Sequence, residues 1–566
     1  MSLKKKRKWN YEIEPDEIFL DSHNSPQFDV QQLEGKIEKP ISKRTIVFLG
    51  LSFIMIGLIF IARVWNFQIK KGEAYFEKSE NISLEHKMIF SERGLIYDRN
   101  NIPLVWNVIN TENEPFSKRI YIRKNGFGHL LGYISYPLKD KDGFYWQNEF
   151  VGKDGLEKQY NSFLNGKNGL KLIEVNVKGE IQSENVVEPA ESGQNAIISI
   201  DSRIQNEMYE LIRKWTDLAS FEGGTGIILD VENGEVLAMA NFPEYDPQVL
   251  TEANEREIIA SYVSDKRKPF LNRSLSGLYT PGSVVKPFIA IGALNEGIVD
   301  PLKKILSTGS LTVPNPYFPD KPQVFHDNKA HGWVDMRRAL AVSSNVYFYE
   351  IGGGFEEQSG LGILNIEKYV KLFGLGEKSG IDLPGEIAGI IPSPEWKLKA
   401  FNGDSWRVGD TYNTSIGQYG FQVTPLEIVR GISQIANNGK IIKPKILLDQ
   451  NIIDTNSNEE YIDLNQYFFQ IVKEGMRQAV TDGTATRLNL PFIKVAAKTG
   501  TAQVGAKRKF MNSWVSGFFP LDSPKYAFVV MLESAPSTNT IGATNVMADL
   551  LEWMNLNTPE YLVSSI

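Results

Sequence analysis

Three short stretches of the sequence carry side chains that could perform acyl transfer, and the first is YTPGSVVKPF (279–288). It places Ser283 three residues before Lys286, directly after a Pro-Gly turn. In the first turn of a helix this spacing brings both side chains onto one face, where a neutral lysine could take the hydroxyl proton of the serine. That chemistry requires burial or cationic neighbours to lower the pKa of Lys286. The alternative interpretation is that Ser283 is an ordinary helix cap.

The S-x-x-K pattern is a weak signal by itself, because short motifs recur by chance. A second match, Ser2 to Lys5, lies in a basic N-terminal run where nucleophilic catalysis is implausible. The surroundings of each match must therefore decide its meaning.

Two later motifs support a catalytic role for Ser283. The stretch AVSSNVYFYE places Ser343 and Asn345 in a polar notch between two apolar helical segments. The stretch KVAAKTGTAQ ends a strand-like run with Lys498, Thr499, Gly500 and Thr501. A glycine at such a point lets a substrate backbone approach closely. Each motif has a plain alternative, a helix-breaking turn or a chance tripeptide, but the three in this order on helix, loop and strand indicate one active site.

The segments around these motifs predict an α+β domain that begins near residue 196. NAIISIDSRIQNEMYELIRKW (195–215) predicts a strand and then an amphipathic helix with Ile204, Met208, Leu211 and Ile212 on one face. TGIILDVENGEVLAMAN (225–241) predicts two strands joined by a turn at 232–234. NSWVSGFF and KYAFVVMLE predict a second pair, and NVMADLLEWM a closing helix. The segments 284–297 and 335–351 between the pairs are mostly helical. Because strands bracket helices instead of alternating with them, we expect an antiparallel sheet.

An apolar run near the N-terminus predicts a membrane anchor. TIVFLGLSFIMIGLIFIA (45–62) has 18 residues without a charge, about the length that crosses a bilayer. The basic residues before it favour an N-terminus inside the cell and a single-pass chain whose catalytic domain lies outside, periplasmic or extracellular. The alternative is a buried core helix. We expect a cytoplasmic tail (1–44), an anchor (45–63), a non-catalytic pedestal (64–195) and a catalytic domain (196–566).

Composition excludes several classes of function. The net charge of -7 provides no broad basic surface, which argues against nucleic acid as the main partner. The chain has no cysteine, so disulfides, thiolate zinc sites and a cysteine nucleophile are excluded. With 42% hydrophobic residues, the 566-residue chain can form a sizeable core.

The three motifs S-x-x-K, S-x-N and K-T-G resemble the signature of penicillin-binding proteins and serine β-lactamases. ERGLIYDRNNIPL, GKDGLEKQYNSFLNGKNG and NRSLSGLYTPGS are similar to stretches of the membrane-anchored class B penicillin-binding proteins. HGWVDMRRALAVSSNVYFYE, PSPEWK and WRVGDTYNTSIGQYGFQVTPLEI resemble the elongation type, similar to penicillin-binding protein 2. The resemblance implies one transmembrane helix, a β-rich pedestal, and a transpeptidase domain with a five-stranded antiparallel sheet flanked by helices.

The same resemblance implies a penicillin-sensitive peptidoglycan D,D-transpeptidase that crosslinks stem peptides through an acyl-serine and releases D-alanine. It implies a role in lateral wall elongation and cell shape. The family pattern assigns Ser283 as the nucleophile, Lys286 as its base, Ser343 as the proton donor to D-alanine and Asn345 as a positioning group. It assigns the oxyanion hole to the backbone N–H groups of Ser283 and Thr501, and substrate binding to Lys498, Thr499, Gly500 and Thr501.

The resemblance implies no cofactor. Its implied partners are peptidoglycan stem peptides, β-lactam antibiotics, the inner membrane, a SEDS-family glycosyltransferase and other proteins of the elongation complex. Four other roles remain open as alternatives: a division-type transpeptidase, a β-lactam sensor, a β-lactamase and a purely structural member of the family.

One further group of residues invites a metal hypothesis. Some elongation-type relatives bind zinc in this region with a cysteine, and this sequence has Ser344 where that cysteine would be. The plain alternative is that the group hydrogen-bonds a loop beside the active site. Its members are His326, Asp327, His331 and Asp335.

Overall fold

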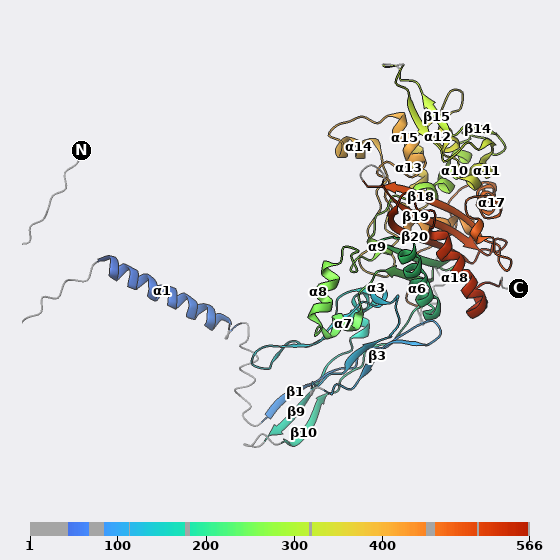
Figure 1. Ribbon diagram of the computed structural model, residues 1–566. Coiled ribbons are helices and arrows are strands. Elements are labelled where there is room, and N and C mark those ends of the chain that lie inside the picture. The colour runs from blue at the N-terminus through green and yellow to red at the C-terminus, as the bar shows by residue number, and fades with distance from the viewer. Residues whose placement is uncertain are drawn as a thin grey trace, which may run out of the picture. The chain divides into compact units, whose positions relative to one another are not determined.

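The computed structural model describes residues 43–66, 69, 84–111, 114–175, 181–315, 318, 320–448, 459–505 and 509–563 (Figure 1). Ser2, Lys5 and nearly all of the expected tail 1–44 lie outside the described residues. The chain divides into two compact units, Met1–Glu85 with Ile173–Ser183, and His86–Leu172 with Glu184–Ile566. Each unit is described by itself.

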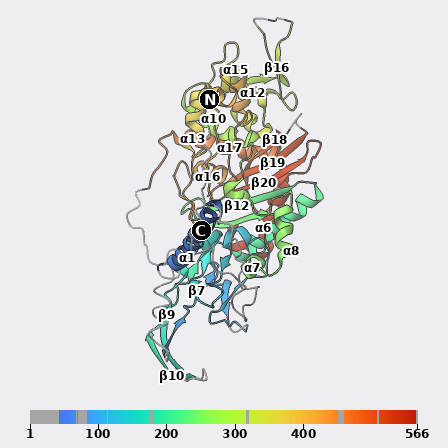
Figure 2. The same ribbon diagram turned by 90° about the vertical axis from the view of Figure 1, so that its left-hand side faces the viewer.

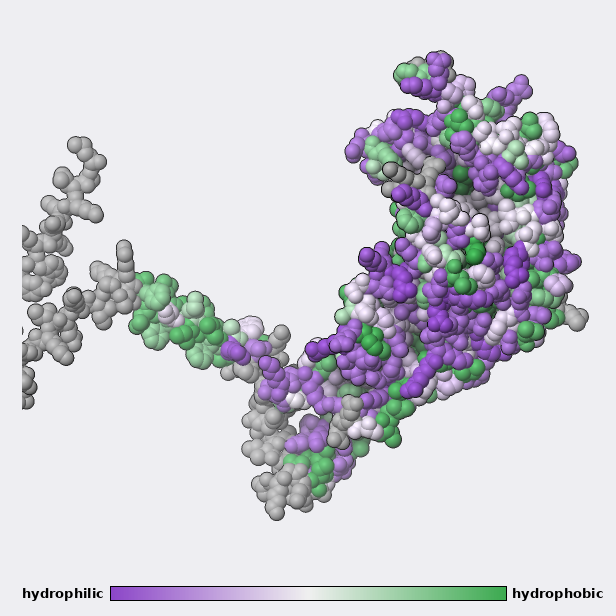
Figure 3. Space-filling view, viewed as in Figure 1, coloured by the Kyte–Doolittle hydropathy of each residue, from purple (hydrophilic) through white to green (hydrophobic). Residues whose placement is uncertain are grey.

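In the first unit, helix α1 (Lys43–Trp65) contains the predicted apolar run. Its residues Val47–Trp65 have a mean hydropathy of 2.4, and none of their most apolar window is buried. Figure 3 shows this helix covered mainly by hydrophobic residues. A helix of 23 residues rises about 35 Å at about 1.5 Å per residue, so α1 is long and apolar enough to cross a membrane.

The second unit is built on a five-stranded antiparallel sheet in the order β13-β12-β20-β19-β18. Its strands are β12 (Gly223–Asp230), β13 (Val236–Phe242), β18 (Ala496–Val504), β19 (Phe510–Phe519) and β20 (Tyr526–Pro536). Both predicted strand pairs are confirmed, and so is the antiparallel sheet. In this order β18, which carries the K-T-G motif, is an edge strand.

Helices cover both faces of the sheet, because successive side chains of a strand point to opposite sides. Ile228 packs in one core with α6 (Ser202–Leu218) and the closing helix α18 (Ala543–Asn557). Its neighbours Ile227 and Leu229 pack in the other core, with α10 (Lys286–Asn295) and α16 (Pro425–Ala436). Figure 2 shows α6 and α16 on opposite sides of β12.

The helical region after α10 positions the second motif. The segment 335–351, expected to be mostly helical, forms two helices, α11 (Met336–Val342) and α12 (Asn345–Gly353). The break between them is the predicted polar notch. Helix α17 (Gln466–Asp482) packs against both α11 and β18, so it lies behind the second and third motifs.

The N-terminal part of the second unit holds a four-stranded sheet in the order β11 (Ala196–Ile197), β2 (Ile96–Tyr97), β3 (Pro103–Val108) and β4 (Lys118–Tyr121). Beside it Glu157 is buried between two arginines. Its carboxylate lies 2.6 Å from Arg93 Nε and 2.8 Å from Arg119 Nε. Because breaking a buried pair leaves an uncompensated charge, these three residues are expected to fix this region in one arrangement.

The other described elements are short. They are β1 (Leu84–Ile89), β2 (Ile96–Tyr97), β3 (Pro103–Val108), β4 (Lys118–Tyr121), α3 (Gly128–Leu131), β5 (Ile134–Ser135), β6 (Leu138–Lys139), β7 (Tyr145–Gln147), β8 (Val151–Gly152), α4 (Gly155–Gln159), α5 (Asn161–Leu164), β9 (Gly169–Val175), β10 (Ile181–Glu188), β11 (Ala196–Ile197), α7 (Pro247–Glu252), α8 (Arg256–Ser264), α9 (Arg273–Ser276), β14 (Ile305–Ser307), β15 (Ser310–Val313), β16 (Gln323–His326), β17 (Gly332–Val334), α13 (Ile363–Leu372), α14 (Pro394–Ala400) and α15 (Val408–Ser415).

Candidate active site

Ser283 lies in a short 3-10 turn, η4 (Gly282–Val285), that leads directly into α10. The turn starts from Gly282, whose φ of 58° is a left-handed conformation that suits glycine. The N-cap of η4 is Pro281 and that of α10 is Val285, and neither helix start has a side-chain cap hydrogen bond. The interpretation of Ser283 as an ordinary helix cap is therefore wrong, and the residue is half-buried.

Lys286 is fully buried and points at the notch between α11 and α12. Its Nζ donates to Asn345 Oδ1 at 2.8 Å and to the backbone oxygens of Ser343 and Ser344 at 2.9 and 3.2 Å. Burial lowers the pKa of Lys286 to about 7, and the carboxylate of Asp327 only partly opposes this. A substantial fraction of Lys286 is therefore neutral near neutral pH and able to accept a proton.

Ser343 ends α11 in a left-handed conformation, with a φ of 60°. Such a backbone costs roughly 1 kcal/mol or more for a residue with a side chain, and it persists where the surrounding structure requires it. Here it breaks the helix so that the carbonyl of Ser343 faces Lys286. The Ser343 hydroxyl accepts from Lys498 Nζ at 2.8 Å and lies 3.5 Å from Lys286 Nζ. One hydroxyl thus joins the two lysines.

Lys498 is the third residue of β18, so K-T-G lies near the start of this strand and not at its end. The side chain is fully buried, and its Nζ also donates to the Thr499 carbonyl at 2.9 Å. Burial and the positive charge of Lys286 hold the pKa of Lys498 well below its usual range. Because two buried ammonium groups repel each other, one proton in this pair is easier to lose than in an isolated lysine.

The next two residues of β18 bring it against the nucleophile turn. The Thr499 hydroxyl donates to Thr484 Oγ1 at 2.6 Å, just beyond the end of α17. A Cβ on Gly500 would lie 2.8 Å from the carbonyl oxygen of Pro281 and 3.0 Å from Val284 Cγ1. Glycine is needed at this position, because only its absent side chain lets β18 approach η4 this closely.

Thr501 follows Gly500 in β18, and it is exposed. Its carbonyl oxygen would be 3.1 Å from a Cβ on Gly282, so the backbones of residues 282 and 501 are near neighbours. The backbone N–H of Gly282 donates to the carbonyl of Gly417 at 3.0 Å, which holds the turn from the other side. The structure thus brings all three motifs together at one edge of the sheet.

Asp327 is a residue of this site whose part the sequence analysis did not identify. Its Oδ2 accepts from the Ser344 hydroxyl at 2.8 Å and from the backbone N–H groups of Asn345 and Val346 at 2.7 and 3.0 Å. Burial raises the pKa of Asp327, but the backbone hydrogen bonds and Lys286 outweigh it and hold the pKa below its usual value. The backbone N–H groups in the first turn of α12 have no acceptor within the helix, so they need one from elsewhere. This need was the only signal in the sequence for the hydrogen bonds that Asp327 makes.

The four residues of the metal hypothesis do not converge. Asp335 caps α11 by accepting from the Arg338 backbone N–H, and His331 Nε2 lies 3.8 Å from Asp327 Oδ1. The side chain of His326 is exposed. Within the described ranges no group of three metal-ligating side chains occurs. The plain alternative, that this group supports a loop beside the active site, holds for Asp327.

Comparison with known protein families shows the family to which this chain belongs. Residues 224–552 match the family described as penicillin binding protein transpeptidase domain, and residues 106–197 match the penicillin-binding protein dimerisation domain. The chain belongs to the penicillin-binding proteins. This penicillin-binding protein is 29% identical over 482 residues to the peptidoglycan D,D-transpeptidase MrdA of Haemophilus influenzae, covering 79% of this chain and 71% of that one.

Solved structures agree with the family. Penicillin-binding protein 2 (PBP2) of Pseudomonas aeruginosa, in complex with WCK 5153, matches this penicillin-binding protein with a TM-score of 0.69 at 27% identity. That match covers 85% of this chain and 99% of the other. PBP2 of Helicobacter pylori, in a complex with MreC, matches with a TM-score of 0.69 at 25% identity, over 84% and 99% of the two chains. The predicted resemblance to the elongation type is confirmed.

Proposed function

We propose that this chain is a peptidoglycan D,D-transpeptidase, the activity that the name of its Haemophilus relative states for that protein. We also propose that it works through an acyl-serine intermediate. The observation that carries the proposal is the environment of Lys286. This lysine is buried, is hydrogen-bonded to Asn345 and has a pKa of about 7. It follows, by three residues, a serine that does not act as a helix cap. A serine with a neutral lysine beside it has what nucleophilic catalysis requires.

In the first half of the reaction, the Ser283 hydroxyl gives its proton to Lys286 and its oxygen attacks the carbonyl of the penultimate D-alanine. The backbone N–H groups of Ser283 and Thr501 hold the negative oxygen of the tetrahedral intermediate. When the intermediate collapses, the C–N bond to the last D-alanine breaks. The proton passes through the Ser343 hydroxyl to the departing amine, and Asn345 keeps Lys286 in place.

In the second half, an amine from a neighbouring stem peptide attacks the ester carbon. Its surplus proton returns through the same groups to the oxygen of Ser283 as the ester C–O bond breaks, which restores the enzyme and leaves a crosslink. The donor peptide lies as an added strand along the exposed edge of β18. Lys498, with the hydroxyls of Thr499 and Thr501, binds its terminal carboxylate, and Gly500 leaves room for its backbone.

The expected organisation of the chain is part of the proposal. We assign 1–44 to a cytoplasmic tail, 45–63 to a single transmembrane anchor, 64–195 to a pedestal and 196–566 to a catalytic domain outside the inner membrane. The apolar helix α1 supports the anchor. The basic residues before it support an N-terminus inside the cell.

We further propose a role in lateral wall elongation and cell shape, in preference to septal division. The resemblance to MrdA and to PBP2 structures supports this choice, and the complex of a PBP2 with MreC supports a partner from the elongation complex. A SEDS-family glycosyltransferase is the other partner that we propose. Depletion of the protein separates the two roles, since rounded cells support elongation and filaments support division.

The acyl-serine is tested by labelling the purified full-length protein with a fluorescent penicillin. We expect one covalent label on the wild type and none on Ser283→Ala. An unlabelled wild type, or equal labelling of the variant, would overturn the proposed function.

A further inference from the structure

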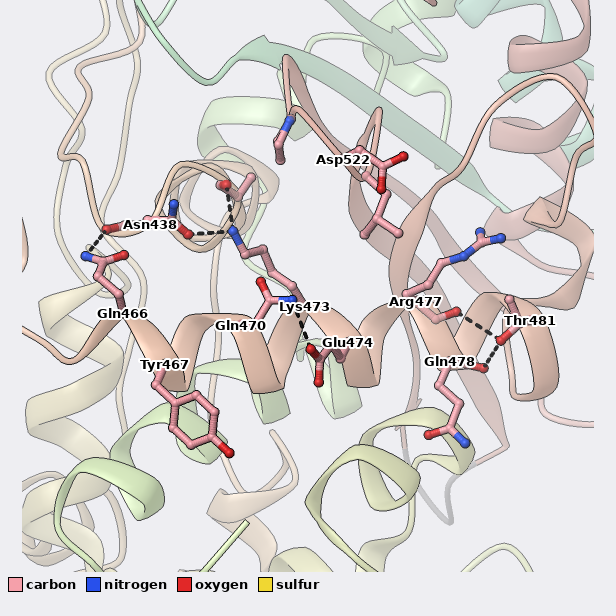
Figure 4. A pocket seen from close by; sticks show the side chains of 13 residues that line it. Asn438, Gln466, Tyr467, Gln470, Lys473, Glu474, Arg477, Gln478, Thr481 and Asp522 are labelled. Carbon is pink, nitrogen blue, oxygen red and sulfur yellow. Dashed lines mark hydrogen bonds between the residues drawn. The ribbon is translucent and has the colours of Figure 1, made fainter. Parts of the chain in front are cut away.

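A groove on α17 lies outside the candidate active site, and the proposed function gives no role to the residues that line it. It has a volume of about 830 Å³ and runs along one side of the helix, from Gln466 to Thr481. Its other wall is formed by Asn438 and by the turn at 521–524. Figure 4 shows the side chains of α17 that face this space.

Two cations on α17 face the groove without a carboxylate at ion-pair distance. Lys473 is 9% exposed, and its Nζ donates to Asn438 Oδ1 at 2.5 Å and to the Ala436 carbonyl at 3.4 Å. Arg477 donates to the Val495 carbonyl at 2.9 Å and to Asn489 Oδ1 at 3.4 Å. All four acceptors are neutral. Among the described residues, neither cation belongs to an ion pair.

The acidic residues of the groove are already paired with other cations. Glu474 lies 2.5 Å from Arg337 Nε and accepts from Gln470. Asp522 lies 2.9 Å from Lys494 Nζ. Within the part of the chain that the structure describes, Lys473 therefore has no compensating charge, and the charge of Asp522 only partly compensates Arg477, because burial outweighs it and lowers the pKa of both groups. Burying a charge without a counter-charge costs free energy, which an anion in the groove would recover.

We propose that this groove is a binding site for an oxyanion, a carboxylate or a phosphate group, held between Lys473 and Arg477. The two residues are one helical turn apart, about 6 Å along the axis, so both can reach one anion. The amide groups of Gln470 and Gln478 on the same side of the helix supply further N–H donors.

The groove has a direct connection to the active site. Arg477 holds the carbonyl of Val495, which is the residue before β18, and Lys498 lies three residues further on. The end of α17 leads to Thr484, whose hydroxyl meets that of Thr499. An anion that draws Arg477 into the groove would therefore act on the strand that carries K-T-G.

The test is a calorimetric titration of the full-length protein in detergent at constant ionic strength, with inorganic phosphate, pyrophosphate and glutarate as separate ligands. Constant ionic strength matters because salt screens exposed charges. We expect saturable binding of at least one of them, and the comparison tells phosphate from carboxylate recognition. Removal of one charge-assisted hydrogen bond in Arg477→Gln should weaken it by roughly tenfold, and Arg477→Lys should restore part of the affinity.

Two controls keep the result interpretable. Gln470→Glu puts a negative charge on an exposed groove position without altering Lys473 or Arg477, and it should also weaken binding. Lys371→Gln removes a charge from α13, where Lys371 pairs with Glu367, and should leave binding unchanged. Melting curves without ligand establish that each variant is folded. Absence of saturable binding in the wild type, or wild-type affinity in both Arg477→Gln and Gln470→Glu, would overturn the site.

A second readout, the rate of acylation by a fluorescent penicillin with and without the bound anion, rests on the proposed function. We expect the anion to change this rate in the wild type and not in Arg477→Gln. A rate that does not respond to a bound anion overturns the connection to β18. A wild type that takes no label overturns the proposed function instead, while the titration still decides the oxyanion site.

Discussion

The carboxylate of Asp327 accepts a hydrogen bond of 2.7 Å from the backbone N–H of Asn345, from a loop 18 residues earlier in the chain. The same oxygen accepts from Val346 and from the Ser344 hydroxyl. The first turn of α12 is thus held by Asp327, which is not part of any of the three motifs, together with the Ser344 hydroxyl, which accepts from the Tyr347 backbone N–H. Since the amide of Asn345 holds Lys286, the position of the proposed base depends on Asp327.

Asp327→Asn should therefore lower both stability and activity. The amide keeps one acceptor oxygen but loses the charge, so we expect the free energy of unfolding to fall by about 1 to 3 kcal/mol. We also expect acylation by a fluorescent penicillin to slow by more than roughly tenfold, because Asn345 and Lys286 lose their fixed positions. Chemical denaturation and stopped-flow labelling measure the two effects.

Asp335→Asn is the matched control, since Asp335 caps α11 through the Arg338 backbone N–H. Asparagine caps a helix about as well as aspartate, so the free energy of unfolding should change little, and acylation should remain within a few-fold of the wild type. If both variants slowed acylation equally, Asp327 would be a general stabilising residue and not a positioning residue.

Lys286→Arg tests whether Lys286 acts as a base or only as a positive charge. Arginine keeps the charge, but its pKa is too high for it to release a proton at neutral pH. We expect the acylation rate to fall by at least about 100-fold, the usual contribution of a general base. Circular dichroism establishes that the variant is folded. Retained acylation in a folded variant would contradict the proposed role.

The acylation rate should depend on pH in the sense that a lysine base requires. Lys286 is protonated and inactive below its pKa of about 7, so the rate should rise with pH and level off above that value. Each pH unit below the pKa should reduce the rate by roughly tenfold. Stopped-flow acylation across neutral pH measures this profile, and a rate independent of pH would count against Lys286 as the base.

Gly500→Ala should damage the site through the backbone. The new Cβ would lie 2.8 Å from the Pro281 carbonyl oxygen, so β18 and the nucleophile turn must separate. We expect acylation to slow by more than roughly tenfold, because small displacements of reacting groups have large effects on rate. Gly226→Ala in β12 is the control, since its Cβ would meet the flexible side chain of Met208. Its acylation rate should stay close to that of the wild type.

Much of this protein is determined by local patterns in its sequence. The apolar run of α1, the amphipathic α6 and the strand pairs β12–β13 and β19–β20 follow from the periodicity of apolar residues, which is a local property. The three motifs, taken in their order along the chain, also select Ser283, Lys286, Ser343, Asn345 and Lys498 as candidate site residues.

Other features depend on contacts between distant segments, and only the tertiary structure decided them. Whether Ser283 caps a helix depends on the left-handed Gly282 and the 3-10 turn, which helix propensity does not distinguish from an ordinary N-terminus. The near-neutral pKa of Lys286 arises from burial against residues almost 60 positions away. Asp327 stabilises the start of α12 because the fold places it beside that helix. Burial and hydrogen-bond partners are properties of the packed chain, so a one-dimensional pattern shows which residues can react but not what tunes them.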